Sequence, residues 1–142
     1  MIAYFDTSAV VPLLVEDEPG SEVCVRVFLE VETVATVRLT FAEAGAALAR
    51  AARLGSLTAE AHERALAEFE SAWARMDVLD VDDDLVRQAG ALARTHALRG
   101  YDAVHCAAGL GVESADTVGL AGDQELLAAW HREGLQVIDT RA

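Results

Sequence analysis

Short apolar runs alternate along the chain with longer amphipathic stretches. The short runs predict strands at residues 2–5, 33–37, 78–81, 117–120 and 135–138. The longer stretches, begun by Asp, Ser, Thr or Pro and often ended by Gly, predict helices at residues 7–16, 19–30, 40–54, 58–75, 82–98, 101–112 and 123–133. Strands that alternate with helices predict a three-layer α/β/α fold with a mainly parallel, five-stranded sheet, formed by one domain over residues 1–142.

In an open parallel sheet, ligands bind beyond the carboxyl ends of the strands, where the strand order reverses. If the chain winds from the first strand to the third and then lays the fourth beside the first, the crevice lies between strands one and four. Asp6 ends the first predicted strand, and Asp123 follows the fourth after Ala121 and Gly122. Two carboxylates are therefore expected to flank this crevice.

Each acidic residue near a predicted strand end also has a purely structural explanation. Thr40 and Glu43 have the spacing of a capping box, and aspartate is a favoured N-cap at Asp102, at Asp123 and at 82–84. Position in the sheet separates these cases. The acids at 82–84 follow an edge strand about 10 Å from the first strand, so capping is preferred for them. Glu43 follows the neighbouring strand and can reach the crevice, whereas spacing alone does not place Asp102.

The charged residues of the chain exclude several classes of protein. The chain has 142 residues, 24 acidic and 11 basic, for a net charge of −13, and all 11 basic residues are arginine. The absence of lysine excludes a Walker-A phosphate loop and a Schiff-base enzyme. A net charge this negative also disfavours nucleic-acid binding through a broad basic face.

Carboxylates gathered in one crevice raise one another's pKa, and a divalent cation relieves that repulsion. Hard oxygen ligands select Mg²⁺, with Mn²⁺ as the other candidate, and magnesium commonly takes only one or two carboxylates directly. The four histidines are scattered and show no zinc spacing. A magnesium–carboxylate site serves phosphoryl chemistry, because the metal activates a water molecule and stabilises charge on the phosphate oxygens.

The cysteines and the N-terminus bear on the cellular compartment in which the protein is expected. Cys24 and Cys106 fit neither a metal site nor a disulfide framework, and both are expected to be small buried side chains in a reducing environment. The N-terminus lacks a positively charged signal-peptide region, and the apolar runs are shorter than the roughly 18 residues that span a membrane. A cytoplasmic protein with no membrane contact is expected.

Four segments carry a family resemblance: Tyr4-Phe5-Asp6-Thr7-Ser8-Ala9, Glu43, Leu98-Arg99-Gly100-Tyr101-Asp102-Ala103-Val104-His105 and Gly122-Asp123-Gln124-Glu125-Leu126. In order and spacing they resemble the PIN-domain ribonucleases, and most closely the VapC-type toxins of bacterial toxin–antitoxin pairs. The resemblance covers essentially the whole chain. It implies the strand order 3-2-1-4-5 and a Mg²⁺-dependent endoribonuclease that acts as a toxin.

The resemblance also implies ligands and partners. Asp6, Glu43, Asp102 and Asp123 match the family's Mg²⁺-binding acids, with Asp6 and Asp102 as direct ligands and the other two acting through water. RNA is the implied substrate. The implied partners are a VapB-type antitoxin that inserts a segment into the crevice, and a second copy bound through the helical hairpin at 40–75.

This chain departs from the family pattern at two places. Ala121 stands where many relatives have Thr or Ser, two residues before the fourth acid, which removes a hydroxyl near Asp123. The first helix reads Val10-Val11-Pro12-Leu13, where relatives often carry a lysine.

Several other residues are candidates for smaller roles. Thr7 or Ser8 is expected either to hydrogen-bond a metal-bound water or to cap the following helix. Arg38 and Arg99 follow predicted elements near the crevice and either hold RNA phosphates or pair with surface acids. His105 lies one turn after Asp102, and we favour packing over proton transfer for it.

Other functions stay open. A housekeeping PIN-domain RNA-processing nuclease and a catalytically silent PIN-like binding module both fit the same residues. A receiver domain and a haloacid-dehalogenase-like phosphatase also use an aspartate after the first strand. Both need a lysine and a second nearby acid, which this chain lacks around Asp6-Thr7-Ser8.

Overall fold

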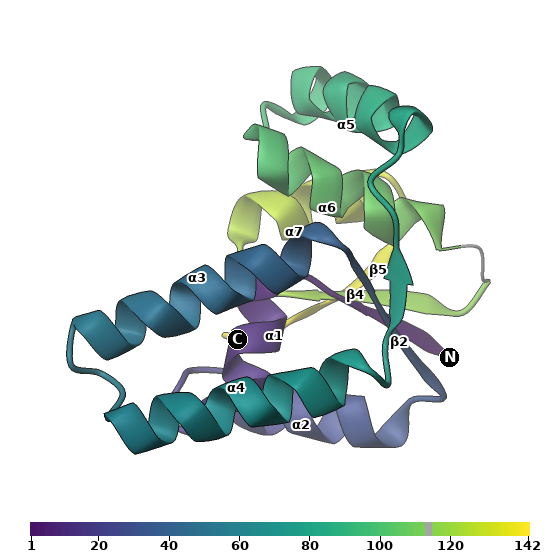
Figure 1. Cartoon of the computed structure of the whole chain (residues 1–142). Coiled ribbons are helices and arrows are strands. Elements are labelled where there is room, and N and C mark those ends of the chain that lie inside the picture. Colours follow the sequence, from purple (N-terminus) through teal and green to yellow (C-terminus); the bar gives the residue numbers. More distant parts are fainter. Residues whose placement is uncertain (113–114) are drawn as a thin grey trace.

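A parallel sheet of five strands lies at the centre of the computed structural model, which describes residues 1–112 and 115–142 (Figure 1). The order is β3-β2-β1-β4-β5, and all four neighbouring pairs are parallel. The strands are β1 (Ile2–Phe5), β2 (Thr33–Val37), β3 (Asp77–Leu79), β4 (Thr117–Ala121) and β5 (Gln136–Asp139). The predicted α/β class, the strand order and the reversal between β1 and β4 are confirmed.

The helices occupy the predicted stretches with ends that differ by one or two residues. They are α1 (Thr7–Leu14), α2 (Ser21–Glu30), α3 (Leu39–Arg53), α4 (Ala59–Trp73), α5 (Asp83–His96), α6 (Gly100–Gly111) and α7 (Gln124–Arg132). The strand predicted at 78–81 ends at Leu79, because its partner β2 gives way to α3 after the pair Val37–Leu79. Among the described residues, no helix has the length and apolar character needed to cross a membrane.

Alternate residues of β1 serve two separate cores. Ala3 and Phe5 pack with α1–α4 on one face of the sheet, and Tyr4 packs with α5–α7 on the other. Figure 1 shows these two groups of helices on opposite sides of the strands. This alternation is the period of two that a strand buried on both faces must have. Cys24 and Cys106 are free and buried, one in each core, as predicted.

In the core between the sheet and α5–α7, here called the second core, the buried indole of Trp130 packs against two glycines. A Cβ atom at Gly119 would lie 2.7 Å from this ring, and one at Gly109 would lie 2.8 Å from it. The indole N–H donates a hydrogen bond of 3.2 Å to the carbonyl of Cys106. Trp130 therefore fits against both β4 and α6, and α6 is the helix that carries Asp102.

We expect Gly119→Ala to lower the free energy of unfolding by about 1–3 kcal/mol, because the added methyl group overpacks a rigid buried ring. Gly90→Ala is the control, since a Cβ there meets nothing within 4 Å inside α5. It should raise the same quantity by about 0.5–1 kcal/mol. Equilibrium urea unfolding measures both, and a Gly119→Ala variant as stable as the wild type would contradict this packing.

Candidate active site

A cavity of about 370 Å³ lies at the carboxyl ends of β1 and β4, and the four predicted acids line it: Asp6, Glu43, Asp102 and Asp123. A fifth acid, Glu18, and Arg141 also line it and were not predicted from the sequence. Thr7, Ser8, Arg99 and His105 also line it. The structure thus brings together seven of the eight residues predicted for the site. The eighth, Arg38, is not among the lining residues and forms an exposed ion pair of 2.7 Å with Asp80.

Asp6 is held by its local sequence. As the N-cap of α1 it accepts a hydrogen bond from the amide of Ala9 at 3.1 Å and one from the Ser8 hydroxyl at 2.7 Å. The Ser8 oxygen in turn accepts from the amide of Gly122 at 2.7 Å, which ties α1 to the loop after β4. Burial raises the pKa of Asp6 to about 6, and the charge of Asp123 adds to this rise against the opposing effects of His105, Ser8 and Ala9.

Two of the capping predictions are confirmed. Asp123 is the N-cap of α7 and accepts from the amide of Leu126 at 3.0 Å, although it also lines the cavity. Asp82 is the N-cap of α5 and accepts from the amide of Leu85 at 2.9 Å, and the acids at 82–84 stay outside the cavity. A cap role and a place in the site are therefore compatible at Asp123.

The capping alternative is wrong for Glu43 and for Asp102. α3 begins at Leu39 after Arg38, so Thr40 is already helical, and its buried hydroxyl lies 2.7 Å from that of Thr36. Because Thr40 is not the N-cap, Glu43 forms no capping box, and its side chain lines the cavity. α6 likewise begins after Arg99, which leaves Asp102 inside the first turn of the helix and facing the same cavity.

Glu43 is bonded by side chains that are distant in the sequence. Its Oε1 accepts from the Thr7 hydroxyl at 2.8 Å and lies 2.7 Å from Nε2 of His105. Burial alone would raise the pKa of Glu43, but the hydrogen bond and charge of His105, together with the Thr7 bond, outweigh burial and lower it.

His105 does more than the packing role favoured from the sequence. It is buried, and its Nδ1 lies 2.8 Å from the Tyr4 hydroxyl while its Nε2 faces Glu43. One sequence feature could have placed His105 at the cavity. Asp102 and His105 are three residues apart on one helix, and this spacing puts both side chains on the same helix face. Tyr4 carried no comparable signal.

Arg99 lies between two acids at the mouth of the cavity. Its Nε donates to Asp102 at 3.1 Å, its guanidinium is 3.7 Å from Asp123, and it stacks 4.8 Å from the ring centre of Tyr101. Burial and the charge of Asp123 raise the pKa of Asp102, and Arg99 opposes this rise. An exposed arginine therefore partly neutralises the aspartates.

The donor set fits a divalent cation that keeps most of its waters. Among the described residues, no three Asp, Glu, His or Cys side chains stand close enough to enclose a metal ion. However, Asp6, Asp102 and Asp123 offer oxygen donors to one cavity, and the charge of Asp123 raises the pKa of both other aspartates. Mg²⁺ is usually held by one or two carboxylates and water, so this arrangement suits it better than a cage would.

Comparison with known proteins gives consistent matches. The family model described as "PIN domain" matches residues 3–111. Ribonuclease VapC45 of Mycobacterium tuberculosis (strain CDC 1551 / Oshkosh) is 37% identical over 136 residues, which cover 96% of this chain and 94% of the relative.

Solved structures share the fold. The structure of M. tuberculosis VapC20, described as a sarcin-ricin-loop-cleaving toxin, superposes with a TM-score of 0.69 at 21% identity and covers 99% of both chains. A toxin–antitoxin complex from Klebsiella pneumoniae gives a TM-score of 0.66 at 15% identity over 97% of both chains.

Asp6→Asn tests the cost of burying the Asp6 charge. The folded chain keeps the Asp6 proton up to about pH 6, whereas the unfolded chain releases it near the ordinary value of 3.8. The Asp6 contribution to stability therefore falls as pH rises from about 4 to 6, by on the order of 3 kcal/mol. Asparagine keeps the cap without the charge, so the variant should be more stable than the wild type at pH 7 and similar to it near pH 4.

Urea unfolding with a chelator present, at pH 7 and pH 4, makes this comparison. Asp82→Asn is the control, because asparagine caps an exposed helix start as well as aspartate does and should change little at either pH. A wild-type protein that is more stable than Asp6→Asn at pH 7 would contradict the assignment.

Proposed function

Since this chain belongs to the PIN-domain family, and within it to the VapC ribonucleases, we propose that it is a Mg²⁺-dependent endoribonuclease that acts as the toxin of a toxin–antitoxin pair. The observation that carries the proposal is the convergence of the four predicted acids on one cavity at the reversal point of the sheet: Asp6, Glu43, Asp102 and Asp123.

The family resemblance gives each acid a role. Asp6 and Asp102 would hold the metal directly, and Glu43 and Asp123 would act through water. When bound, Mg²⁺ supplies an activated water nucleophile and stabilises charge on the scissile phosphate. Ser8 orients Asp6 through its 2.7 Å hydrogen bond, and Thr7 orients Glu43 through a bond of 2.8 Å.

Arginines would supply the remaining contacts to RNA. Arg99 is exposed at the cavity mouth, and a metal that neutralises Asp102 would leave its guanidinium available to a phosphate. Arg38 stays a predicted phosphate contact; its ion pair with Asp80 is exposed on both sides and therefore weak enough to exchange. With a net charge of −13, RNA affinity should depend on the metal and on these few arginines.

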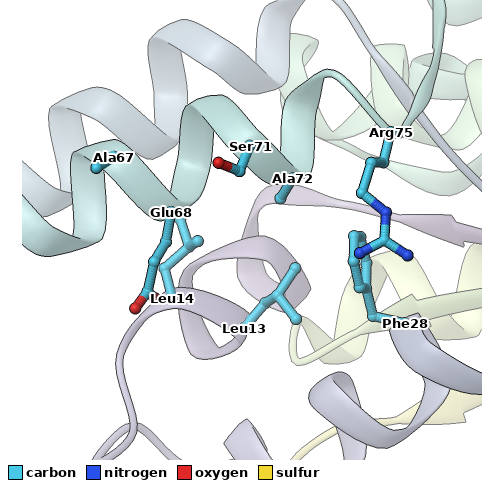
Figure 2. A pocket seen from close by; sticks show the side chains of 8 residues that line it. All are labelled: Leu13, Leu14, Phe28, Ala67, Glu68, Ser71, Ala72 and Arg75. Atoms are coloured by element: carbon cyan, nitrogen blue, oxygen red, sulfur yellow. The ribbon is translucent and has the colours of Figure 1, made fainter.

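The proposed partner is a VapB-type antitoxin, and a solved toxin–antitoxin complex from K. pneumoniae shares the fold. One segment of the antitoxin would enter the acidic cavity, as the family resemblance implies. A second cavity of about 360 Å³, here called the antitoxin seat, would bind a further, apolar antitoxin segment (Figure 2). Leu13 and Leu14 of α1, Phe28 of α2 and Ala72 of α4 line it, and Arg75 lies over the Phe28 ring at 5.2 Å. A basic antitoxin would also be attracted by the negative charge of this chain.

Homodimerisation through the hairpin at 40–75 stays a prediction. Phe41 of α3 stacks on Phe69 of α4 at 4.9 Å and meets Trp73 edge-on at 5.1 Å. The hairpin thus uses part of its apolar stripe internally, and Phe41 keeps 38% of its surface exposed for a second copy.

A cleavage assay tests the nuclease directly. We expect the purified chain to cut total RNA with Mg²⁺ and to stop when a chelator is added. Asp6→Asn and Asp102→Asn should each lower the cleavage rate at least about 100-fold, because loss of a ligand should exceed the 10–100-fold effect typical of its supporting groups. Asp82→Asn, a helix cap outside the cavity, should cut normally.

Undiminished cleavage by either site variant would refute the proposed metal site. No cleavage by a folded wild-type chain that binds Mn²⁺ would favour the silent binding module. An antitoxin gene directly upstream would favour the toxin over a housekeeping nuclease.

The antitoxin seat is tested by Ser71→Arg, which places a bulky charge in the second cavity from an exposed position of α4. We expect it to reduce co-purification with the co-expressed antitoxin at least about tenfold without affecting RNA cleavage. Ala74→Arg adds the same side chain at an exposed site that does not line the cavity, and it should bind normally. Equal retention of both variants would exclude this seat.

A further inference from the structure

A line of hydrogen bonds runs from the buried second core to the acidic cavity. It begins at Tyr4 of β1, passes through His105 of α6 and ends at Glu43 of α3. The Tyr4 hydroxyl lies 2.8 Å from Nδ1 of His105, and Nε2 lies 2.7 Å from Oε1 of Glu43. Tyr4 and His105 are both essentially without solvent contact, whereas the Glu43 side chain keeps 24% of its surface exposed at the cavity.

The partners decide where the imidazole proton lies. Burial and the nearby carboxylates of Asp6 and Glu43 raise the pKa of Tyr4 well above its ordinary value, so its phenol stays protonated. A neutral His105 then accepts a hydrogen bond from the phenol at Nδ1 and carries its own proton on Nε2. A protonated His105 carries a proton on both nitrogens. In either charge state, Nε2 donates to Glu43.

The two donors to Glu43 meet at one oxygen. Thr7 and His105 both reach Oε1, at 2.8 Å and 2.7 Å, so these bonds attach that oxygen to the fold and do not occupy Oε2. A carboxylate at the edge of a cavity would otherwise rotate among several rotamers, and fixing it lowers the entropic cost of binding a ligand.

We propose that Tyr4 and His105 are positioning residues that hold Glu43 so that Oε2 is presented to a divalent cation or to its bound water. This inference rests on the proposed metal-dependent function. A purely structural role would not need two buried polar groups, because an apolar side chain at position 105 would fill the same core without their desolvation cost.

A matched pair of double variants separates positioning from packing. Tyr4→Phe/His105→Gln keeps an N–H donor within reach of Glu43, and Tyr4→Phe/His105→Leu removes it. Both variants lack the phenol, so no hydroxyl is left without a partner. We expect the Gln variant to bind Mn²⁺ within a few-fold of the wild type, and the Leu variant to bind it about 10–100-fold more weakly.

Stability should follow the opposite order. The Leu variant, with an apolar side chain in the core, should unfold at the same or a higher urea concentration than the Gln variant. Calorimetric titration with Mn²⁺ at constant pH measures the affinities. Cys106→Ala, which alters a neighbouring buried side chain of α6, is the control and should leave Mn²⁺ affinity unchanged.

¹⁵N NMR of the histidine-labelled chain reads the proton position without any metal. The wild type should show a proton on Nε2 of His105, and Tyr4→Phe, which removes one hydroxyl only, should shift the Nδ1 resonance because that nitrogen loses its hydrogen bond, while Glu43 keeps the proton on Nε2. The single variant also remains informative if the double variants do not fold.

Two results would overturn the proposal: a folded Leu variant that binds Mn²⁺ as tightly as the wild type, or a wild-type His105 whose only proton is on Nδ1. A wild-type chain that binds no Mn²⁺ at millimolar concentration would instead refute the proposed metal-dependent function. The NMR result would then decide the hydrogen-bond arrangement by itself.

Discussion

The parallel pairing of β1 with β4 is the constraint on which the site depends. Phe5 lies opposite Leu120, and the amide of Asp6 donates to the Leu120 carbonyl at 3.2 Å. Because both strands end at the same edge of the sheet, the residues that start the next two helices are brought together there. Asp6 and Asp123 are those residues, and each caps its own helix while lining the common cavity.

Gathering carboxylates in this way costs free energy, and the structure offsets the cost at each group separately. Ser8 and a backbone amide hold Asp6, Thr7 and His105 hold Glu43, and Arg99 pairs with Asp102. The offset is incomplete, because the pKa values of Asp6 and Asp102 stay raised. On the proposed function, that remaining repulsion would favour a divalent cation, whose positive charge would let a chain with a net charge of −13 act on a phosphate.

The site also depends on packing far from it. Trp130 lies against Gly109 of α6 and Gly119 of β4, and this contact sets how closely α6 approaches the sheet. α6 in turn carries both Asp102 and His105 to the cavity. The packing of the second core therefore determines, through α6, where Asp102 and His105 lie in the cavity.

The sequence by itself determined the elements, the α/β class and the position of Asp6 and Asp123 at the ends of two strands. Those features depend on local periodicity, on helix starts and stops, and on the rule that parallel strands present their carboxyl ends together. The resemblance to the PIN-domain family supplied the full strand order and Asp102, which spacing alone could not place.

Only the tertiary structure decided how the side chains pair. The spacing of Thr40 and Glu43 fits a capping box, yet Glu43 bonds to Thr7 and His105 instead. Tyr4 and His105 are 101 residues apart and meet because β1 and α6 pack together. A capping box is a choice between neighbours a few residues apart. These pairings depend on burial and on the distance between elements, which the local pattern of a sequence does not contain.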